Sequence, residues 1–324
     1  IVFANGDTLY GRDVSNGNLV KRLKGPVDSE VLLEVYRKGE PELLKFKIKR
    51  DHIPIKSVDA SYMLTDRLGY IKVNRFAEST YKEFKRALNN LQKDGATELV
   101  LDLRGNPGGF LNIAEQMVDE FLEDDKLILF TKNKRGKIEK SFATRRGAFE
   151  DGHVYVLIDE NSASASEIVA GALQDNDKGT IVGRRSYGKG LVQREMKLGD
   201  GSAVRLTVSR YYTPTGRSIQ RSYKKGNADY FDDYYSRVDS GELLDPEKIE
   251  VADSLKFTTP NGKVVYGGGG IIPDVFVALD ESMQNETITF LQRRGYINSF
   301  AFEVLEKDRT IFEGETRQDF IENY

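Results

Sequence analysis

The spacing of apolar residues predicts short strands alternating with helices from about residue 69 onward. Residues 69–76 alternate in polarity as a strand does, and residues 98–105 hold an apolar run that is typical of a buried strand. Between them, Ser79 is a suitable N-cap for a helix that ends near Leu91. The later elements are predicted as helices at 113–121 and 165–174, strands at 126–132, 153–160 and 180–185, and a hairpin at 191–213. This alternation predicts an α/β layered core.

Residues 1–50 show a different pattern and are predicted to form a small module of their own. Residues 1–9 are expected to form a strand and a turn, and residues 18–23 a short helix. Residues 31–50 have the pattern of a hairpin that turns at 39–41. Because the chain opens on strand-like residues without an initiator Met, we expect it to be an internal fragment and this module to be incomplete.

The remaining parts of the chain carry weaker patterns. Residues 222–262 are polar and rich in Asp, Tyr and Lys, so they are expected to form a long insertion or cap. The segment at 266–275 becomes strand-like after four glycines, and residues 281–324 are expected to be helical. The predicted division of the chain is therefore 1–50, 51–280 and 281–324.

Composition excludes several kinds of chemistry. The 324 residues carry a net charge of -3, so a nucleic acid partner is not expected, and the short basic run at 132–135 is taken as solvated loop charge. The chain has no cysteine, so disulfides and cysteine nucleophiles are excluded. Its two histidines, His52 and His153, have no metal-ligand neighbours at helical spacing, so a zinc site is not expected. No apolar run reaches the roughly 18 residues of a membrane span.

The stretch GRRSYGKGLVQ at 183–193 has the G-x-x-x-x-G-K pattern of a phosphate-binding loop. Such a loop needs a Ser or Thr after the lysine, and a helix that begins there. Here Gly190 follows Lys189, and the next residues alternate as a strand does. Nucleotide binding is therefore a disfavoured hypothesis for this stretch.

The stretch ENSASASEI at 160–168 places three serines between a buried strand and a helix. A serine at a helix N-terminus lies beside free backbone N–H groups, which can stabilise the oxyanion of acyl transfer. Ser164 and Glu167 also fit a capping box, which is the commoner explanation for such a pattern in isolation.

Lys189 can supply the base that a serine nucleophile needs in a chain with so few histidines. A lysine acts in this way when burial leaves its amine neutral. Residues 189, 191 and 193 would share one face of a strand, so Gln193 could orient Lys189. The alternative is an exposed lysine in a Gly-Lys-Gly turn.

The stretch LDLRGNPGG at 101–109 ends a strand in a glycine-rich turn. Glycines at such a turn allow backbone N–H groups to approach a ligand closely. An ordinary connection between a strand and a helix is the alternative.

Taken together, the three stretches resemble the carboxyl-terminal processing, or tail-specific, serine proteases. The family signature runs in the order DLRxNxGG, SASE and GKGxxQ, and the chain has these motifs at 102–109, 164–167 and 188–193. Ser164 and Lys189 are 25 residues apart, as in the family. GGIIPDV at 269–275 is similar to the GIxPDV strand near the end of the family's catalytic domain. The resemblance covers about residues 1–280.

The resemblance implies a Ser-Lys dyad, with Ser164 as the nucleophile, Lys189 as the general base and Gln193 orienting the lysine. The implied oxyanion hole consists of backbone N–H groups: that of Ala165 and that of either Gly108 or Gly109. The implied activity is that of a serine endopeptidase, which cleaves protein substrates near their C-terminus through an acyl-enzyme. No metal or cofactor is implied.

The family fold is a crotonase-like α/β core, related to that of ClpP, joined to a PDZ domain that captures C-terminal tails. Residues 1–50 are similar to the latter part of such a PDZ domain, whose carboxylate-binding loop would lie upstream of residue 1. The resemblance implies a periplasmic or cell-envelope location and polypeptide tails as partners, and it is compatible with a homo-oligomer. The alternative is an inactive or latent scaffold of PDZ type that binds peptides without cleaving them.

Overall fold

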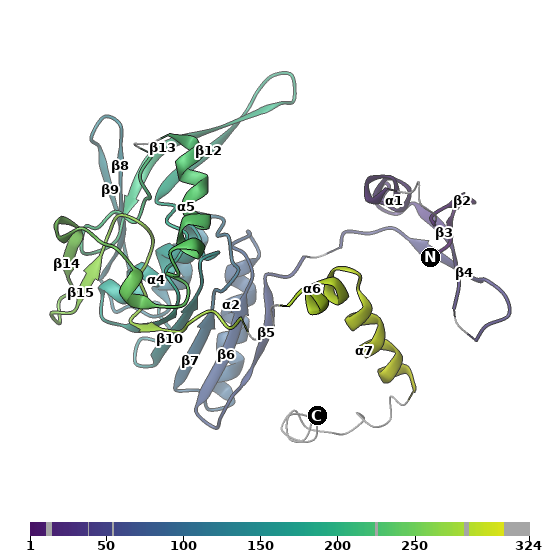
Figure 1. The fold of residues 1–324 in the computed structure, drawn as a ribbon, viewed down its shortest axis with the longest axis horizontal. Helices are drawn as coiled ribbons and strands as arrows, with labels where there is room; N and C mark the ends of the chain where they lie inside the picture. Colours follow the sequence, from purple (N-terminus) through teal and green to yellow (C-terminus); the bar gives the residue numbers. More distant parts are fainter. Residues whose placement is uncertain (11–14, 38, 54, 224–225, 282–284, 308–324) are drawn as a thin grey trace. The chain divides into compact units, whose positions relative to one another are not determined.

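The computed structural model describes residues 1–10, 15–37, 39–53, 55–223, 226–281 and 285–307. The chain divides into two compact units, Ile1–Lys56 and Ser57–Tyr324 (Figure 1). Each unit has a buried apolar cluster of its own, and the cluster of the second unit is much the larger.

The first unit is a four-stranded antiparallel sheet with one helix, in the strand order β2-β1-β3-β4. Its elements are β1 (Phe3–Ala4), β2 (Asp7–Thr8), α1 (Asn16–Leu23), β3 (Glu30–Val35) and β4 (Leu44–Lys49). The unit extends to Lys56 and not only to residue 50. Arg50 belongs to it because its guanidinium donates to the carbonyl oxygens of Leu23 at 2.8 Å and Glu30 at 2.9 Å.

A six-stranded sheet lies at the centre of the second unit, in the order β16-β11-β10-β7-β6-β5. Its strands are β5 (Val58–Met63), β6 (Leu68–Val73), β7 (Glu98–Asp102), β10 (His153–Ile158), β11 (Gly179–Gly183) and β16 (Val275–Phe276). All neighbours are parallel except β5, which pairs antiparallel with β6 at the edge. The sequence expectations lack β5, although Val58, Ala60 and Tyr62 alternate with polar residues there.

The helices that cover this sheet are α2 (Thr80–Lys93), α3 (Leu111–Asp119) and α4 (Ala165–Asp175). α2 packs on β5 and β6, α4 packs on β11, and α3 contacts both other helices. Phe84, Leu88 and Leu91 of α2 are buried, as their spacing predicts. Ser79 precedes α2 as expected, but its hydroxyl donates to Glu83 Oε1 at 2.7 Å and does not cap the helix.

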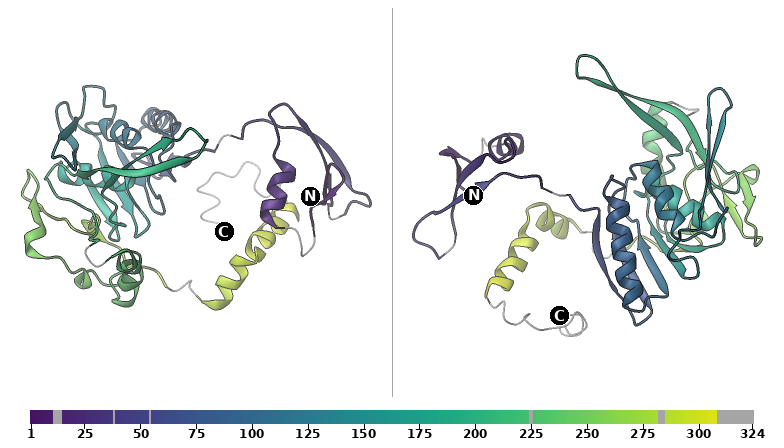
Figure 2. Two further views of the ribbon diagram at one scale, coloured as in Figure 1. Left: turned by 90° about the horizontal axis from the view of Figure 1, so that it is seen from above. Right: turned by 180° about the vertical axis from the view of Figure 1, so that it is seen from behind.

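A second sheet is antiparallel, in the order β12-β13-β8-β9. Its strands are β8 (Leu127–Asn133), β9 (Ile138–Phe142), β12 (Leu191–Lys197) and β13 (Ala203–Tyr212). The β8–β9 and β12–β13 hairpins project from the same end of the unit (Figures 1 and 2). The expectation of a solvated loop at 132–135 is wrong in part, because Lys132 lies in β8 and pairs with both Arg210 and Ile138.

The stretch expected as a polar cap at 222–262 contains regular structure. Its elements are α5 (Asn227–Asp239), two 3-10 turns at Pro246–Lys248 and Asp253–Leu255, and β14 (Lys256–Thr258), which pairs with β15 (Val264–Tyr266). Two further helices follow, α6 (Glu286–Arg293) and α7 (Tyr296–Lys307). The rest of the expected helical segment, residues 308–324, lies outside the described residues. In the part of the chain that the structure describes, no helix combines the length and apolarity needed to cross a bilayer.

Candidate active site

The three motif stretches follow the carboxyl ends of neighbouring parallel strands. Residues 103–110 follow β7, residues 159–164 follow β10, and residues 184–190 follow β11. β10 lies between β7 and β11 in the sheet. Because parallel strands end at the same edge, the sheet brings these three loops together although they are distant in sequence.

Ser164 lies at a sharp turn between β10 and α4. Its backbone has a φ of 56° and a ψ of -111°, a conformation that residues other than glycine rarely adopt. The small side chains of Ala163 and Ala165 on either side are buried. Ser164 itself is half-buried and lines a cavity. Backbone strain of this kind is concentrated at functional sites.

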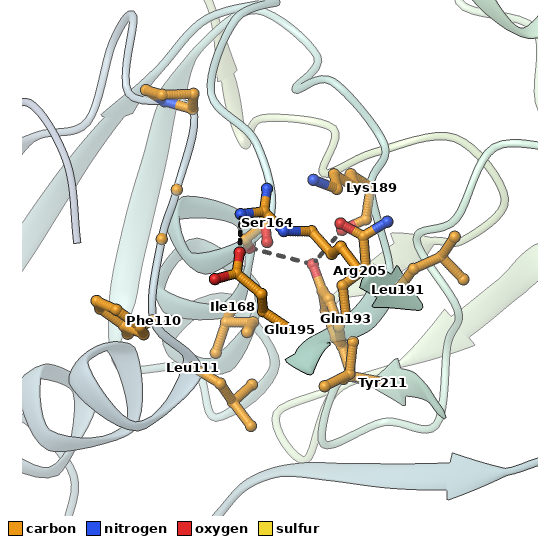
Figure 3. A pocket seen from close by; sticks show the side chains of 14 residues that line it. Phe110, Leu111, Ser164, Ile168, Lys189, Leu191, Gln193, Glu195, Arg205 and Tyr211 are labelled. Carbon is orange, nitrogen blue, oxygen red and sulfur yellow. Dashed lines mark hydrogen bonds and ion pairs between the residues drawn. The ribbon is translucent and has the colours of Figure 1, made fainter. Parts of the chain in front are cut away.

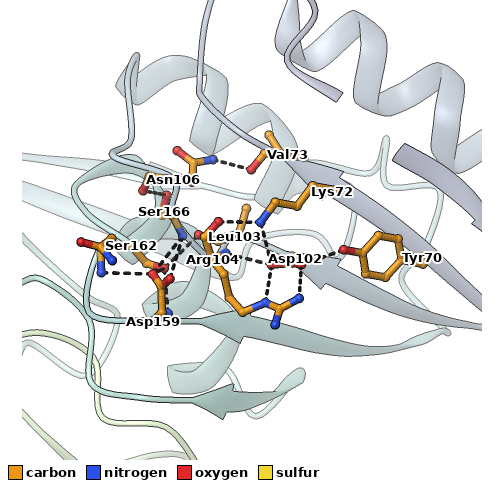
Figure 4. Close-up of polar contacts among 12 residues, drawn as sticks. Tyr70, Lys72, Val73, Asp102, Leu103, Arg104, Asn106, Asp159, Ser162 and Ser166 are labelled. Atoms are coloured by element: carbon orange, nitrogen blue, oxygen red, sulfur yellow. Dashed lines mark hydrogen bonds and ion pairs between the residues drawn. The ribbon is translucent and has the colours of Figure 1, made fainter. Parts of the chain in front are cut away.

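The other two serines of the motif hold this turn in place. The Ser162 hydroxyl donates to the carbonyl oxygen of Leu103 at 2.8 Å, and the Ser166 hydroxyl donates to that of Asn106 at 2.9 Å. Both serines are fully buried (Figure 4). They fasten the Ser164 turn to the loop after β7, so Ser164 is the serine of the motif that lines the cavity.

Gly108 and Gly109 lie directly against their neighbours and have no room for a side chain. A Cβ on Gly108 would lie 2.5 Å from the carbonyl oxygen of Ala163, and a Cβ on Gly109 would lie 2.1 Å from that of Phe76. Their φ angles, 94° and 152°, are also unfavourable for other residues. Glycine is therefore required at both positions to bring this loop against the Ser164 turn.

The two glycines differ in the use of their N–H groups. The Gly108 N–H donates to Oδ1 of Asn106 at 2.9 Å. The N–H groups of Gly109 and Ala165, by contrast, donate no hydrogen bond to any described residue. Ala165 is the first residue of α4, where an N–H has no partner within the helix. Two free donors therefore lie close to Ser164.

Glu167 joins the Ser164 turn to the loop that carries Lys189. Its carboxylate accepts hydrogen bonds from the N–H groups of Ser164 (2.8 Å), Gly188 (2.6 Å) and Lys189 (2.9 Å). It also accepts one from the Ser186 hydroxyl at 2.5 Å. Burial raises the pKa of Glu167, and these four hydrogen bonds oppose that rise. In the sequence Glu167 is recognisable only as a capping residue, because its other partners lie 19 to 22 residues further along.

Tyr211 of β13 makes a second link between the same two segments. Its hydroxyl lies 3.1 Å from the carbonyl oxygen of Ser164 and 3.0 Å from that of Lys189. Burial raises the pKa of Tyr211 well above its usual value, so the hydroxyl keeps its proton as a donor. No sequence motif marks Tyr211, which the fold brings to the site.

Ser164 and Lys189 line the same cavity, whose volume is about 530 Å³ (Figure 3). Its walls also include Phe110, Leu111, Ile168, Leu191, Gln193, Glu195 and Arg205. Lys189 is half-buried and lies in the loop before β12, not within the strand as expected. The reason is that Gly190 donates its N–H to Oε1 of Gln220 at 2.8 Å and not to a neighbouring strand. Among the described contacts, no hydrogen bond joins Ser164 Oγ to Lys189 Nζ.

Gln193 also lines this cavity, so Lys189, Leu191 and Gln193 share a wall. The Gln193 side chain is exposed to solvent, and the described residues offer no hydrogen bond between it and Lys189. Further along β12, Glu195 accepts a hydrogen bond from Arg205 of β13 at 2.8 Å (Figure 3).

Asp102, the first residue of the DLRxNxGG motif, is buried at the end of β7 (Figure 4). It accepts hydrogen bonds from Tyr70 at 2.7 Å, from Lys72 at 3.1 Å, and from two nitrogens of Arg104 at 3.0 and 2.7 Å. Burial would raise the pKa of Asp102, but these bonds outweigh burial and lower it to about 2. Asp102 and Arg104 therefore anchor the start of the glycine turn.

Comparison with known proteins agrees with this arrangement. Residues 67–227 match the profile of Peptidase family S41, a range that contains all three motifs. The chain is 36% identical over 230 residues to the carboxy-terminal processing protease CtpB of Bacillus subtilis (strain 168). It is 38% identical over 219 residues to a carboxy-terminal-processing protease of Bartonella bacilliformis. The chain belongs to peptidase family S41.

The S41 matches cover 70% and 65% of this chain, but only 46% of the Bacillus protein and 50% of the Bartonella protein. The chain thus spans about half the length of these curated relatives. Among solved structures, the photosystem II D1 C-terminal processing protease is similar, with a TM-score of 0.50 and 26% identity. That match covers 86% of this chain and 62% of the other. The expected family and the mixed α/β fold are confirmed.

Proposed function

We propose that the chain is the catalytic part of a serine endopeptidase that cleaves polypeptides near their C-termini, with Ser164 and Lys189 as its dyad. The observation that carries this proposal is that both residues line one cavity while the same two groups, Glu167 and Tyr211, hold their backbones. The names of the Bacillus and Bartonella relatives support the same reaction class.

In the proposed reaction, neutral Lys189 accepts the proton of the Ser164 hydroxyl as Oγ attacks the carbonyl carbon of the substrate. The N–H groups of Ala165 and Gly109 then donate to the oxyanion, because the Gly108 N–H is already bonded to Asn106. Lys189 returns the proton to the leaving amine, and water hydrolyses the acyl-enzyme. Gln193, on the same wall of the cavity, is the residue that would orient the Lys189 amine.

The absence of a Ser164–Lys189 hydrogen bond in the described contacts is compatible with this mechanism. The backbones of both residues are already held by Glu167, so only the flexible Lys189 side chain has to turn. Catalytic hydrogen bonds are often long before substrate binds and shorten in the complex.

The fold also supports a mode of substrate binding. β12 is an edge strand of its sheet and carries four of the cavity residues, Leu191, Val192, Gln193 and Glu195. An extended peptide can therefore add to β12 and place its carbonyl carbons in the cavity.

The finer assignments of fold and location are part of the same proposal. Residues 1–50 are proposed to be the latter part of a PDZ domain, residues 51–280 a crotonase-like protease domain, and residues 281–324 a helical segment. The antiparallel sheet and single helix of the first unit support the first of these. A periplasmic or cell-envelope location is proposed from the resemblance to the family.

Replacing Lys189 tests the dyad. Lys189→Ala and Ser164→Ala should each lower the kcat/KM for cleavage of unfolded, fluorescently labelled casein by at least about 10³-fold. Folding should be little affected, since both substitutions leave the backbone bonds to Glu167 in place. Lys82→Ala, which changes an exposed lysine of α2, is the control and should retain full activity. Undiminished cleavage by Lys189→Ala would refute the assignment.

A latent peptide-binding scaffold is the second candidate, and the missing Ser164–Lys189 hydrogen bond favours it. Labelling by a serine-reactive acylating probe distinguishes the two. An active enzyme should be labelled at Ser164, and the label should be lost in both Ser164→Ala and Lys189→Ala. A scaffold should remain unlabelled while it still binds peptides.

A further inference from the structure

Positive charge is concentrated in the two projecting hairpins. Residues 127–142 hold five Lys and Arg and one Glu, and residues 191–210 hold four Lys and Arg and two acidic residues. The two segments together therefore carry +6, whereas the whole chain carries -3. The rest of the chain must then carry -9. A charge separation of this size creates a field that directs anions to one part of a surface.

The strand register places three of these cations on one face. Arg210 of β13 is directly opposite Lys132 of β8, and Lys140 of β9 is directly opposite Phe130. Residues opposite one another in antiparallel strands share a face, as do residues two apart, such as Phe130 and Lys132. Arg210, Lys132 and Lys140 therefore form a strip across three strands, called the basic strip below.

The members of the basic strip lack counterions within the described structure. All three side chains are exposed, and none forms an ion pair or hydrogen bond with a described residue. The nearest carboxylates of the sheet are engaged elsewhere, Glu195 with Arg205 and Glu139 with Lys137. Like charges directly opposite each other, as in Arg210 and Lys132, destabilise a sheet. An anionic ligand would remove this repulsion.

The basic strip begins at the wall of the active-site cavity. Arg210 is directly opposite Leu191, which lines the cavity beside Lys189. Strands lie about 4.8 Å apart, so the three steps from β12 to β9 span about 14 Å. An extended peptide covers this distance in about four residues.

Apolar side chains lie on the same face as the basic strip. Ile138 is directly opposite Lys132 and is 50% exposed, and Phe142 follows Lys140 by two residues and is 44% exposed. The face therefore offers both charge and apolar contact to a chain that leaves the cavity across the sheet.

From these observations we propose that the basic strip recruits polypeptide substrates with acidic residues about three to six positions from the cleaved bond. The inference rests on the proposed peptidase function and names a substrate class for it. Polypeptide is favoured over a lipid surface because the strip is continuous with the cavity wall. Residues 1–56 carry +3, so the second unit outside the two hairpins carries -12 and would repel such substrates from its other surfaces.

Binding of matched peptides tests the proposal. The peptides have a core of five alternating Ala and Val residues and a flank of Asp-Glu-Asp-Glu or Asn-Gln-Asn-Gln, with the flank placed at either end. Binding is measured by fluorescence anisotropy to the full chain carrying Ser164→Ala, so that no cleavage occurs. For one of the two positions of the flank, the acidic peptide should bind roughly tenfold more tightly than the neutral peptide at low ionic strength. This preference should shrink as salt is added.

A double variant of the basic strip, Lys132→Glu/Lys140→Glu, is made in the chain that carries Ser164→Ala. It should reduce the preference for the acidic peptide to about twofold or less. The control is Lys82→Glu/Lys93→Glu, which makes the same change in net charge on exposed residues of α2 and should keep the preference. Equal losses in both variants, or no acidic preference at low salt, would overturn the proposal.

Vesicle binding and casein cleavage distinguish peptide recruitment by the basic strip from lipid binding and from the peptidase function itself. The chain could bind vesicles of phosphatidylglycerol and phosphatidylcholine through Lys132 and Lys140 and yet show no preference for acidic peptides. That result would overturn peptide recruitment and would indicate that the basic strip binds a lipid surface. If acidic peptides bind as expected but the unsubstituted chain cleaves no casein, the proposed peptidase function fails and peptide recruitment stands. If casein is cleaved without an acidic preference, only peptide recruitment fails.

Discussion

The two sheets of the second unit differ in burial, because the four-stranded sheet joins the core mainly through residues of β8 and β13 such as Leu129 and Tyr211. In the six-stranded sheet Leu99, Leu101 and Val156 are fully buried beneath helices. In the four-stranded sheet Met196 and Leu206 leave nearly half of their side-chain surface in solvent. The first sheet is mostly parallel and central, whereas the second is antiparallel and forms projecting hairpins (Figure 1).

The difference in burial suggests that one sheet determines the stability of the protein and the other determines how it binds substrate. The strand ends of the buried sheet carry the Ser164 turn, the glycine turn and the Lys189 loop, so its packing decides where the reacting groups lie. The exposed sheet supplies one wall of the cavity and most of the unbalanced positive charge. Substitutions at buried positions of the first sheet should therefore change stability, and substitutions at exposed positions of the second should change substrate binding.

The largest expected effect is at Glu167, beneath the edge of the buried sheet. Glu167→Ala would leave four donors without their acceptor, two of them buried and two partly buried, and should lower the free energy of unfolding by about 4 kcal/mol. The matched substitution in the exposed sheet is Glu195→Ala, which breaks a solvated ion pair with Arg205 and should cost less than about 1 kcal/mol. Urea denaturation of both variants gives the comparison, and similar losses would contradict it.

Two leucines, one in each sheet, give a second test of this difference in stability. Leu101→Ala empties a fully buried position in β7 and should cost about 3 kcal/mol, since a cavity remains. Leu206→Ala removes the same atoms from β13, where the side chain is 48% exposed, and should cost about 0.5 kcal/mol. The two midpoints of chemical denaturation measure this difference. The contrast between the sheets would not hold if Leu206→Ala were as destabilising as Leu101→Ala.

Lowering the pH should reduce the stability of the buried sheet through the Asp102 carboxylate. Its folded pKa of about 2 lies below the usual value of 3.8, so protons bind the unfolded chain first and stability falls as the pH drops from about 4 to about 2. The loss attributable to this group is about 2 kcal/mol. Asp102→Asn should be less stable at pH 7 and should lose less stability over this acid range. Parallel pH profiles for the two proteins would exclude Asp102 as the source.

Much of the site could be predicted from sequence because its motifs are local. The strand-turn-helix at Ser164 and the glycine turn at Gly108 each depend on residues within one short segment. The order and spacing of the three motifs then indicated the family, which the comparisons confirm. The elements that were missed, such as β5 and β9, are short edge strands whose existence depends on a partner strand.

Only the tertiary structure decided which groups hold the two proposed catalytic residues together. Glu167 and Tyr211 act across 22 and 47 residues of sequence, and no local pattern distinguishes them from a cap and a buried aromatic residue. The choice between Gly108 and Gly109 as a free donor likewise depends on the Asn106 side chain. The basic strip exists only because three strands pair in one register. By itself the sequence determined the chemistry of each segment, because side-chain types and turns are local properties. Distances between segments depend on sheet order and packing, which form only when the whole core folds.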